Sequence, residues 1–132
     1  MPGVRRYEDL VVWQLADELK RDVYALTADG AAANDFAFRN QIRNSAASNT
    51  KNIAEGFGRF HPGEFAHFVE FAVASAMETK DWLKDGVDRG YFLPQRVATA
   101  QRLAERSIQC STRFIVYLKL EAERRRRQKK SK

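Results

Sequence analysis

The sequence predicts an all-α protein whose chain folds as one antiparallel, up-and-down four-helix bundle. Four segments carry apolar residues at the three- and four-residue spacing of amphipathic helices, and no segment alternates as a strand would. Glycine or proline stands at the breaks between these segments, and the breaks are short enough to make neighbouring helices antiparallel. The 132 residues suffice for one domain and are too few for two of ordinary size.

The first predicted helix begins after Asp9, whose carboxylate is a plausible N-cap. Residues 27–35 are predicted as a loop, because Asp29-Gly30 is a turn signal and the alanines that follow offer little to pack. The apolar stripe of the first helix consists of Val12, Ala16, Leu19, Val23 and Leu26.

The second predicted helix carries two parallel stripes. The apolar one is formed by Phe38, Ile42, Ala46, Asn49, Ile53 and Phe57. Its neighbour is formed by Gln41, Ser45, Ser48, Asn52, Glu55 and Arg59. This neighbour is polar but begins with four uncharged side chains, whereas a solvated helix face usually carries lysine and glutamate. A buried or interfacial polar seam is therefore the favoured interpretation, and a plain solvated face is the alternative.

The third predicted helix runs from about Gly63 to Asp88, after a glycine-rich turn in which Pro62 suits the first helical turn. Its inward stripe is Phe65, Phe68, Ala72, Ser75, Thr79 and Leu83. It also has a second apolar strip of Phe71, Ala74, Met77 and Trp82. A single bundle buries one stripe per helix, so this strip predicts contact with a second subunit.

The fourth predicted helix follows Gly90, a natural residue for a helix C-terminus, and opens at Pro94. Its inward stripe has a period close to 3.5 and consists of Val97, Ala100, Ala104, Ser107, Ser111, Phe114 and Leu118. The predicted organisation is an N-terminal arm over residues 1–8, the bundle over 9–123, and a basic, disordered tail over 124–132. Four consecutive arginines repel one another and are not expected to end a helix stably.

The charge is concentrated in that tail. The chain has 23 basic and 17 acidic residues, a net charge of +6, and residues 124–132 hold seven of the basic residues and no acid. The remaining 123 residues carry 16 basic and 17 acidic groups, a net charge of −1. With 44% hydrophobic and 30% charged residues, the composition is neither that of a membrane protein nor that of a disordered chain. The single cysteine, Cys110, excludes an internal disulfide and fits a cytoplasmic location.

The string Asn52-Ile53-Ala54-Glu55-Gly56, followed by Arg59, resembles the four-helix-bundle proteins encoded in intervening sequences of bacterial 23S ribosomal RNA genes. Further matches extend the resemblance over roughly residues 7–118: Leu10, Val12, Trp13, Gln14, Ala16, Gln41, Arg43, Phe68, Ala72, Ser75, Glu78, Gly90 and Tyr91. The resemblance implies an up-and-down bundle that assembles as a ring-shaped homopentamer. A distant branch serves as accessory proteins of diversity-generating retroelements, which bind a reverse transcriptase and nucleic acid.

The sequence departs from the family pattern at three positions of the second helix. Asn44 stands where arginine is common, Asn49 where an aliphatic residue is usual, and Lys51 where a small residue is usual. Asn44 weakens the case for an RNA-contacting face on this helix. Asn49 places an amide on the apolar seam, where it fixes helix register at a cost in stability or finds a partner across a subunit interface.

No metal, cofactor or catalytic site is predicted. A di-iron bundle needs a Glu-x-x-His motif on two helices, and this chain has one, Glu64 to His67. Cys110 has no histidine near it in the sequence and is predicted to be a small apolar packing residue. Glu55 and Arg59, with Glu78, are compatible with an acid–base pair, but a structural ion pair is the favoured interpretation.

The sequence therefore predicts a cytoplasmic, non-enzymatic homo-oligomer, a pentamer on the family resemblance, that binds RNA or DNA through phosphates and does not insert into membranes. The predicted contacts are Arg124, Arg125, Arg126, Arg127, Lys129, Lys130 and Lys132, extended by Arg102, Arg106 and Arg113. The predicted structural or interface residues are Gln41, Asn49, Asn52, Glu55, Arg59, Phe71, Glu78 and Trp82. The alternative is a scaffold that docks a protein partner such as a polymerase or reverse transcriptase, with a tail that only aids solubility.

Overall fold

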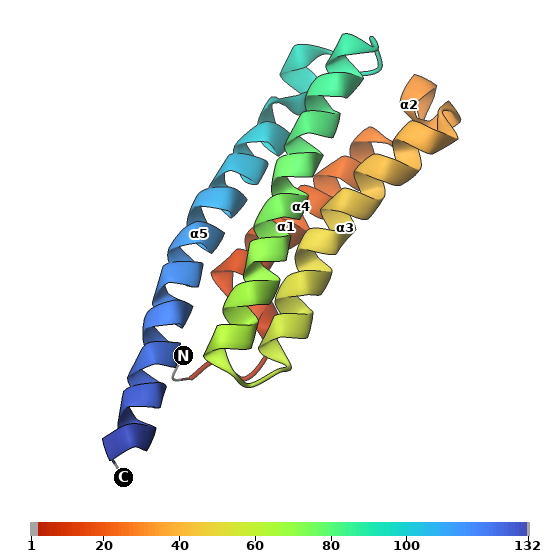
Figure 1. Ribbon diagram of the computed structural model, residues 1–132. Helices are drawn as coiled ribbons and strands as arrows, with labels where there is room; N and C mark the ends of the chain where they lie inside the picture. The colour runs from red at the N-terminus through yellow and green to blue at the C-terminus, as the bar shows by residue number, and fades with distance from the viewer. Residues whose placement is uncertain (1–2, 132) are drawn as a thin grey trace.

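The computed structural model describes residues 3–131, which are all-helical and contain no strand. The elements in chain order are η1 (Tyr7–Asp9), α1 (Val11–Leu26), α2 (Gly30–Asn34), α3 (Phe36–Phe57), α4 (Pro62–Asp88) and α5 (Pro94–Ser131). The four long helices lie side by side, and α1 and α4 each contact both α3 and α5 (Figure 1). The predicted up-and-down arrangement of four helices is thus observed within the chain.

Two local predictions near the N-terminus are wrong. The N-cap of α1 is Leu10, and Asp9 belongs to the preceding 3-10 turn and makes no capping hydrogen bond. The predicted loop over residues 27–35 contains the short helix α2. Gly30 starts α2 with a φ of 71°, and the alanines that follow favour helix over coil once Ala32 packs against the core.

The turn between α4 and α5 is tied to the start of α3 by Asp35. One carboxylate oxygen of Asp35 caps α3 by accepting from the Phe38 backbone N–H at 3.2 Å. The other accepts from the Tyr91 hydroxyl at 2.6 Å and from the Arg89 guanidinium at 3.1 Å. Gly90 has a φ of 79° and ends α4 as predicted. One side chain therefore holds two chain segments together at this end of the bundle.

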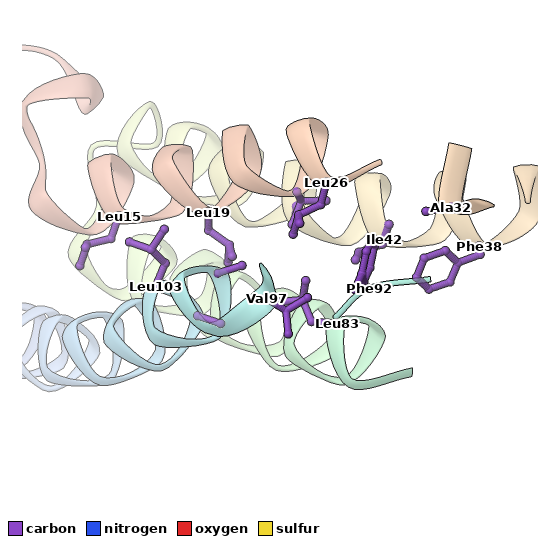
Figure 2. Packing of buried hydrophobic residues seen from close by; sticks show 14 residues of the cluster. Leu15, Leu19, Leu26, Ala32, Phe38, Ile42, Leu83, Phe92, Val97 and Leu103 are labelled. Carbon is purple, nitrogen blue, oxygen red and sulfur yellow. The ribbon is translucent and has the colours of Figure 1, made fainter. Parts of the chain in front are cut away.

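The core consists of two apolar clusters stacked along the bundle axis. The cluster at the α4–α5 turn surrounds Phe38, Ile42, Leu83 and Val97, whose side chains meet between the helices (Figure 2). The other cluster lies at the α3–α4 turn and includes Ile53, Phe65, Val69 and Leu118. Except for the half-buried Phe57, Phe68, Ser75 and Phe114, the predicted inward stripes of α1, α3, α4 and α5 are buried.

A polar layer separates the two clusters. Asn49 of α3 is fully buried and donates to the Ser107 hydroxyl of α5 at 3.1 Å. Beside it, the hydroxyls of Ser45 and Thr79 share a hydrogen bond of 2.8 Å between α3 and α4. The partner of Asn49 thus lies within its own chain.

The basic tail is helical, which corrects the prediction of a disordered segment after residue 123. α5 continues without a break to Ser131, so that its 38 residues span about 57 Å. Glu121 pairs with Arg124 and, at 3.6 Å, with Arg125, and Glu123 pairs with Arg127 at 2.8 Å. These pairs at i, i+3 and i, i+4 offset the repulsion among the arginines, which the composition alone did not reveal.

Candidate nucleic-acid interface

The candidate interface lies where α5 passes the turn between α3 and α4. The same region receives the N-terminal segment, so three separate parts of the chain meet there (Figure 1). α5 then extends beyond the other helices as the C-terminal end of the molecule (Figure 1). From Glu123 onward every described residue of α5 is exposed.

The face of α5 that points into the bundle becomes cationic where the bundle ends. Leu118 is the last core residue of α5, and it is 2% exposed. Ala122, Arg125 and Lys129 continue the same four-, three- and four-residue spacing. Ala122, Arg125 and Lys129 line a hollow against the α3–α4 turn, and Arg126, next to this stripe, lines it as well. The helix therefore presents positive charge on the surface that would otherwise continue the core.

The cations of the tail differ in whether a carboxylate already neutralises them. Glu121 and Glu123 pair with Arg124, Arg125 and Arg127. The hydrogen bond from Arg124 is the main reason why the pKa of Glu121 is lowered, so this carboxylate is ionised at neutral pH.

Three of the remaining predicted tail cations have no such partner among the described residues. Within residues 3–131, Arg126, Lys129 and Lys130 form no ion pair. They are therefore available for phosphate. Lys132, also predicted as a contact, lies outside the described residues.

The α3–α4 turn lines two hollows with the exposed ring of Phe60. Phe60 has a φ of 60° and is 80% exposed. Together with His61 and Pro62 it lines a cavity of about 330 Å³ and also a shallower hollow of about 640 Å³. Arg125 contacts both hollows, so its guanidinium sits at the junction between apolar and cationic surface.

The structure does not bring the predicted arginines of the upstream part of α5 into this interface. At about 100° per residue, Arg102, Arg106 and Arg113 share one exposed stripe that points away from Arg125 and Lys129. Arg113 is also 12 positions, about 18 Å, from Arg125 along the helix. These three arginines therefore form a surface separate from Arg125 and Lys129.

The polar stripe of α3 is divided between an interface and solvent. The Ser48 hydroxyl accepts from Ser75 of α4 at 2.9 Å and from the Asn52 amide at 3.1 Å. Gln41 at one end is exposed. The middle of the stripe is thus a contact between α3 and α4 of one chain.

The other end of the stripe is solvated. Glu55 and Arg59 form an exposed ion pair at 2.8 Å, and the Arg59 guanidinium also lies over the Phe68 ring, 5.1 Å from its centroid. Glu78 accepts from the Trp82 indole N–H at 3.3 Å. The structural interpretation of Glu55 and Arg59 therefore agrees with the geometry.

An apolar strip remains uncovered on the outer side of α4. Phe71 is 48% and Met77 54% exposed, and Ala74 between them is also exposed. Trp82, predicted to extend this strip, instead packs edge-on against Phe38 with ring centroids 5.7 Å apart. Gly86, one turn further along α4, leaves room for the rings of Phe92 and of Phe38, the ring on which Trp82 packs.

No metal centre forms among residues 3–131, where no group of three or more histidine, cysteine, aspartate or glutamate side chains is suitably placed. Glu64 and His67 lie on α4 at exposed positions, and the His67 ring packs against Phe71 at 4.7 Å. Cys110 is half-buried and contacts both core clusters, as predicted for a packing residue. No helix of the described chain has an apolar stretch that would cross a bilayer.

Sequence reasoning missed the residues that complete the interface, namely Arg5, Phe60 and His61. All three lie outside the periodic helical segments, so the spacing that locates core residues gives no information on them. The composition of the turn, Gly58-Arg59-Phe60-His61-Pro62, is a signal that could have found them. In this turn an aromatic residue stands between two basic residues and outside any apolar stripe.

The fold and this interface define a small all-helical bundle protein with a cationic helical extension. The chain belongs to the family of 23S rRNA-intervening sequence proteins, whose model matches residues 8–112. The match ends before the basic end of α5, so the candidate interface lies largely outside the part that defines the family.

A crystal structure of a protein of unknown function from the S23 ribosomal protein family of Bacteroides thetaiotaomicron has the same fold. It is 19% identical, with a TM-score of 0.71, and the match covers 80% of this chain and 98% of that one. No curated protein sequence matches the chain significantly.

Proposed function

We propose that this protein is a non-enzymatic, homo-oligomeric nucleic-acid-binding protein that contacts RNA or DNA phosphates through the basic end of α5. The observation that carries the proposal is the set of three cations, Arg126, Lys129 and Lys130, that lack a carboxylate partner within residues 3–131. Arginine and lysine without intrachain partners retain their full attraction for phosphate.

The rest of the molecule offers little competing attraction for a polyanion. Without residues 124–132 the net charge of the chain changes from +6 to −1. Because the tail is helical, its cations are held at fixed positions on a rigid rod, and less side-chain and backbone freedom is lost on binding than for a disordered tail.

Two triple variants with equal net charge test the proposal. Arg126→Gln, Lys129→Gln and Lys130→Gln remove the unpaired tail cations, and Arg102→Gln, Arg106→Gln and Arg113→Gln remove three cations from the upstream stripe. Glutamine keeps helix propensity close to that of lysine and arginine. Each variant loses three positive charges, so a difference between them reports position and not net charge.

The measurement is a titration of labelled RNA and DNA at several salt concentrations. Three phosphate contacts give a slope of log K against log salt near −3, at about −0.9 per phosphate. We expect the tail variant to lose most of this slope and the upstream variant to keep it. Equal losses would contradict a site on the tail, and a larger loss in the upstream variant would place the site on the bundle.

The exposed strip of Phe71, Ala74 and Met77 supports the homo-oligomer in this proposal. Large apolar side chains on one helix face of a small protein are typical of a subunit contact. The number five comes from the family resemblance. Light scattering of Phe71→Ser with Met77→Ser should give a lower mass than wild type, whereas Val116→Ser with Leu120→Ser, which changes exposed apolar residues of α5, should not.

The same strip favours one alternative, a scaffold that docks a protein partner. Binding to an apolar surface depends weakly on salt, whereas phosphate binding falls steeply as salt rises. If neither the wild-type protein nor any variant binds nucleic acid, the tail proposal fails and the scaffold becomes the better account. If the wild-type protein is also monomeric by light scattering, the strip is open for a different partner.

A further inference from the structure

The exposure and backbone conformation of Phe60 do not contribute to the stability of the fold. It is 80% exposed, the largest exposed fraction among the large apolar side chains of residues 3–131. Its φ of 60° lies in the left-handed region, which a phenylalanine adopts only with strain and a glycine adopts freely. A glycine at position 60 would therefore suit the turn better, and almost none of the ring's surface would be lost from the core. An observed backbone outlier of this kind points to a functional role.

The cavity beside Phe60 is mostly apolar and has the size of a small-ligand site. Its volume is about 330 Å³, within the usual range of about 300–1,000 Å³ for such sites. Tyr117 faces it from α5, and its remaining apolar lining is Val4, Phe57, Pro62, Phe65 and Leu118. A flat aromatic heterocycle fits these walls, because rings stack on rings and need no charged partner.

The two hollows at Phe60 differ in their balance of charge: the smaller is lined by one acid with Arg5 and Arg125, and the larger by one acid with three cations. Glu121 is the acid in the wall of the smaller cavity, and its lowered pKa, caused first by the Arg124 hydrogen bond, keeps it ionised. A carboxylate repels phosphate but accepts a hydrogen bond from the N–H group of a base. The larger hollow is lined by Arg125, Arg126 and Lys129 together with one acid, Glu64, and therefore favours phosphate.

From this juxtaposition we propose that the protein recognises single-stranded nucleic acid by inserting one unstacked base into the cavity between Phe60 and Tyr117. The phosphates next to that base then lie across the edge of the Phe60 ring, on Arg125, Arg126 and Lys129. Arg5, on the N-terminal side of the cavity, contacts the backbone where the strand leaves. This inference rests on the proposed function and adds a preference for single strands.

A duplex does not offer the unstacked base that the cavity requires. In a double helix each base is stacked and paired, and its removal costs several hydrogen bonds and stacking contacts, whereas a single strand offers bases that are already free. A duplex can contact Arg126, Lys129 and Lys130 through phosphates but leaves the cavity empty. The difference in affinity between single strand and duplex therefore measures the use of the cavity.

The central experiment compares wild type with Phe60→Gly and Phe60→Trp. The probes are labelled single-stranded RNA and DNA of about ten nucleotides, within the site size of single-strand binders, and the matching duplexes. We expect Phe60→Gly to bind single strands about 5- to 150-fold more weakly, the range for loss of one base–aromatic stack, and to bind duplex as wild type does. Phe60→Trp should retain single-strand affinity, and its fluorescence should fall on binding because the indole stacks on a base.

A matched control comes from the other end of α3. Phe36 is 64% exposed and carries an arginine, Arg39, over its ring at 5.0 Å, but it lies roughly 33 Å away along the helix. Phe36→Ala should leave both single-strand and duplex binding unchanged. Parallel RNA and DNA probes report which sugar is preferred, and either preference is compatible with a base in the cavity.

The outcomes separate this inference from the function on which it rests. If Phe60→Gly leaves single-strand binding unchanged while the tail variant loses it, the tail binds phosphate and the cavity proposal is wrong. If Phe60→Gly weakens single-strand and duplex binding equally, the ring acts on the fold or the tail and the inference also fails. If no probe binds to wild type, both proposals fall. Thermal melting of Phe60→Gly should show unchanged or increased stability, because the strained conformation is relieved.

Discussion

The Asn49 amide donates a hydrogen bond to the Ser107 hydroxyl at 3.1 Å, between two helices that are not neighbours around the bundle. Asn49 is fully buried and Ser107 is 1% exposed, so water does not compete for this bond. The second polar atom of Asn49, Oδ1, and the hydroxyl of Ser111 one turn further along α5 have no hydrogen-bond partner among residues 3–131. The layer thus fixes the register of α3 against α5 and carries a cost in stability.

We expect Ser107→Ala to lower the free energy of unfolding by about 1–3 kcal/mol, because it leaves the buried Asn49 amide without its acceptor. Thr112→Ala is the control, since the exposed Thr112 hydroxyl lies on the same helix and donates to the Ile108 carbonyl of that helix. Urea denaturation at one fixed protein concentration measures both variants. A loss no larger than that of Thr112→Ala would contradict the hydrogen bond.

Replacing both partners should behave differently. Asn49→Leu with Ser107→Ala makes the layer apolar, so we expect stability equal to or above that of wild type, despite the loss in Ser107→Ala alone. The double variant lacks the hydrogen bond that fixes the register of α3 against α5. Alternative packings should then appear as broadened or doubled NMR resonances of core methyl groups. A double variant that is less stable than Ser107→Ala would show that the layer is optimised for packing and not for register.

Gly56, the last residue of the string Asn52–Gly56, should not tolerate alanine. A Cβ at position 56 would lie 2.6 Å from Phe65 Cδ1 and 2.8 Å from Phe68 Cβ, where α3 and α4 approach each other before their turn. We expect Gly56→Ala to destabilise by about 1–3 kcal/mol through overpacking, despite its better helix propensity. Gly58→Ala is the matched control, because a Cβ there has only ordinary contacts of 3.5 Å or more. Thermal melting of the two variants gives the comparison, and equal melting temperatures would contradict it.

Periodicity predicted the helices and the core because both depend on spacing along the chain, and the stripe from Val97 to Leu118 shows this well. The helical state of the tail was missed because repulsion among the arginines was considered without the i, i+4 pairs, such as Glu123 with Arg127, that offset it. Periodicity also missed the cavity, because Arg5 and Phe60 are distant in sequence and lie outside the periodic helices. The two residues come together only in the folded chain. Tertiary proximity, not local pattern, creates this part of the site.

Asn52 and Glu55 should differ in their effect on stability. The Asn52 amide donates to the Ser48 carbonyl at 2.8 Å and to its hydroxyl, which also contacts Ser75 of α4, so Asn52→Ala weakens the seam by about 0.5–1.5 kcal/mol. Glu55 forms an exposed pair with Arg59, and such pairs contribute about 0–1 kcal/mol. Chemical denaturation of both variants at low protein concentration tests the order. If Glu55→Ala costs more, or changes the mass in light scattering, Glu55 contacts another subunit.

The charge of Asp35 makes the stability of the α4–α5 end depend on pH. The Tyr91 hydroxyl, followed by the Phe38 backbone N–H, lowers the pKa of Asp35, and the same hydrogen bond raises the pKa of Tyr91. A lowered carboxyl pKa adds stability that is present above the unfolded value, about 3.9, and lost as pH falls through the folded value. A raised tyrosine pKa adds stability that is present below about 10 and lost as pH rises through the folded value.

The advantage of wild type over Asp35→Asn should therefore be largest between about pH 4 and pH 10 and shrink beyond either limit. Asparagine is also a good N-cap, so this variant keeps the cap of α3 and removes mainly the charge. Melting temperatures of both proteins across this pH range measure the difference, and subtraction cancels the other carboxylates, including Asp22, whose pKa is raised by burial. Tyr91→Phe should move the pKa of Asp35, measured by NMR titration of its carboxyl carbon, back toward its ordinary value. A constant difference from acid to alkaline pH would show that Asp35 acts only as a cap.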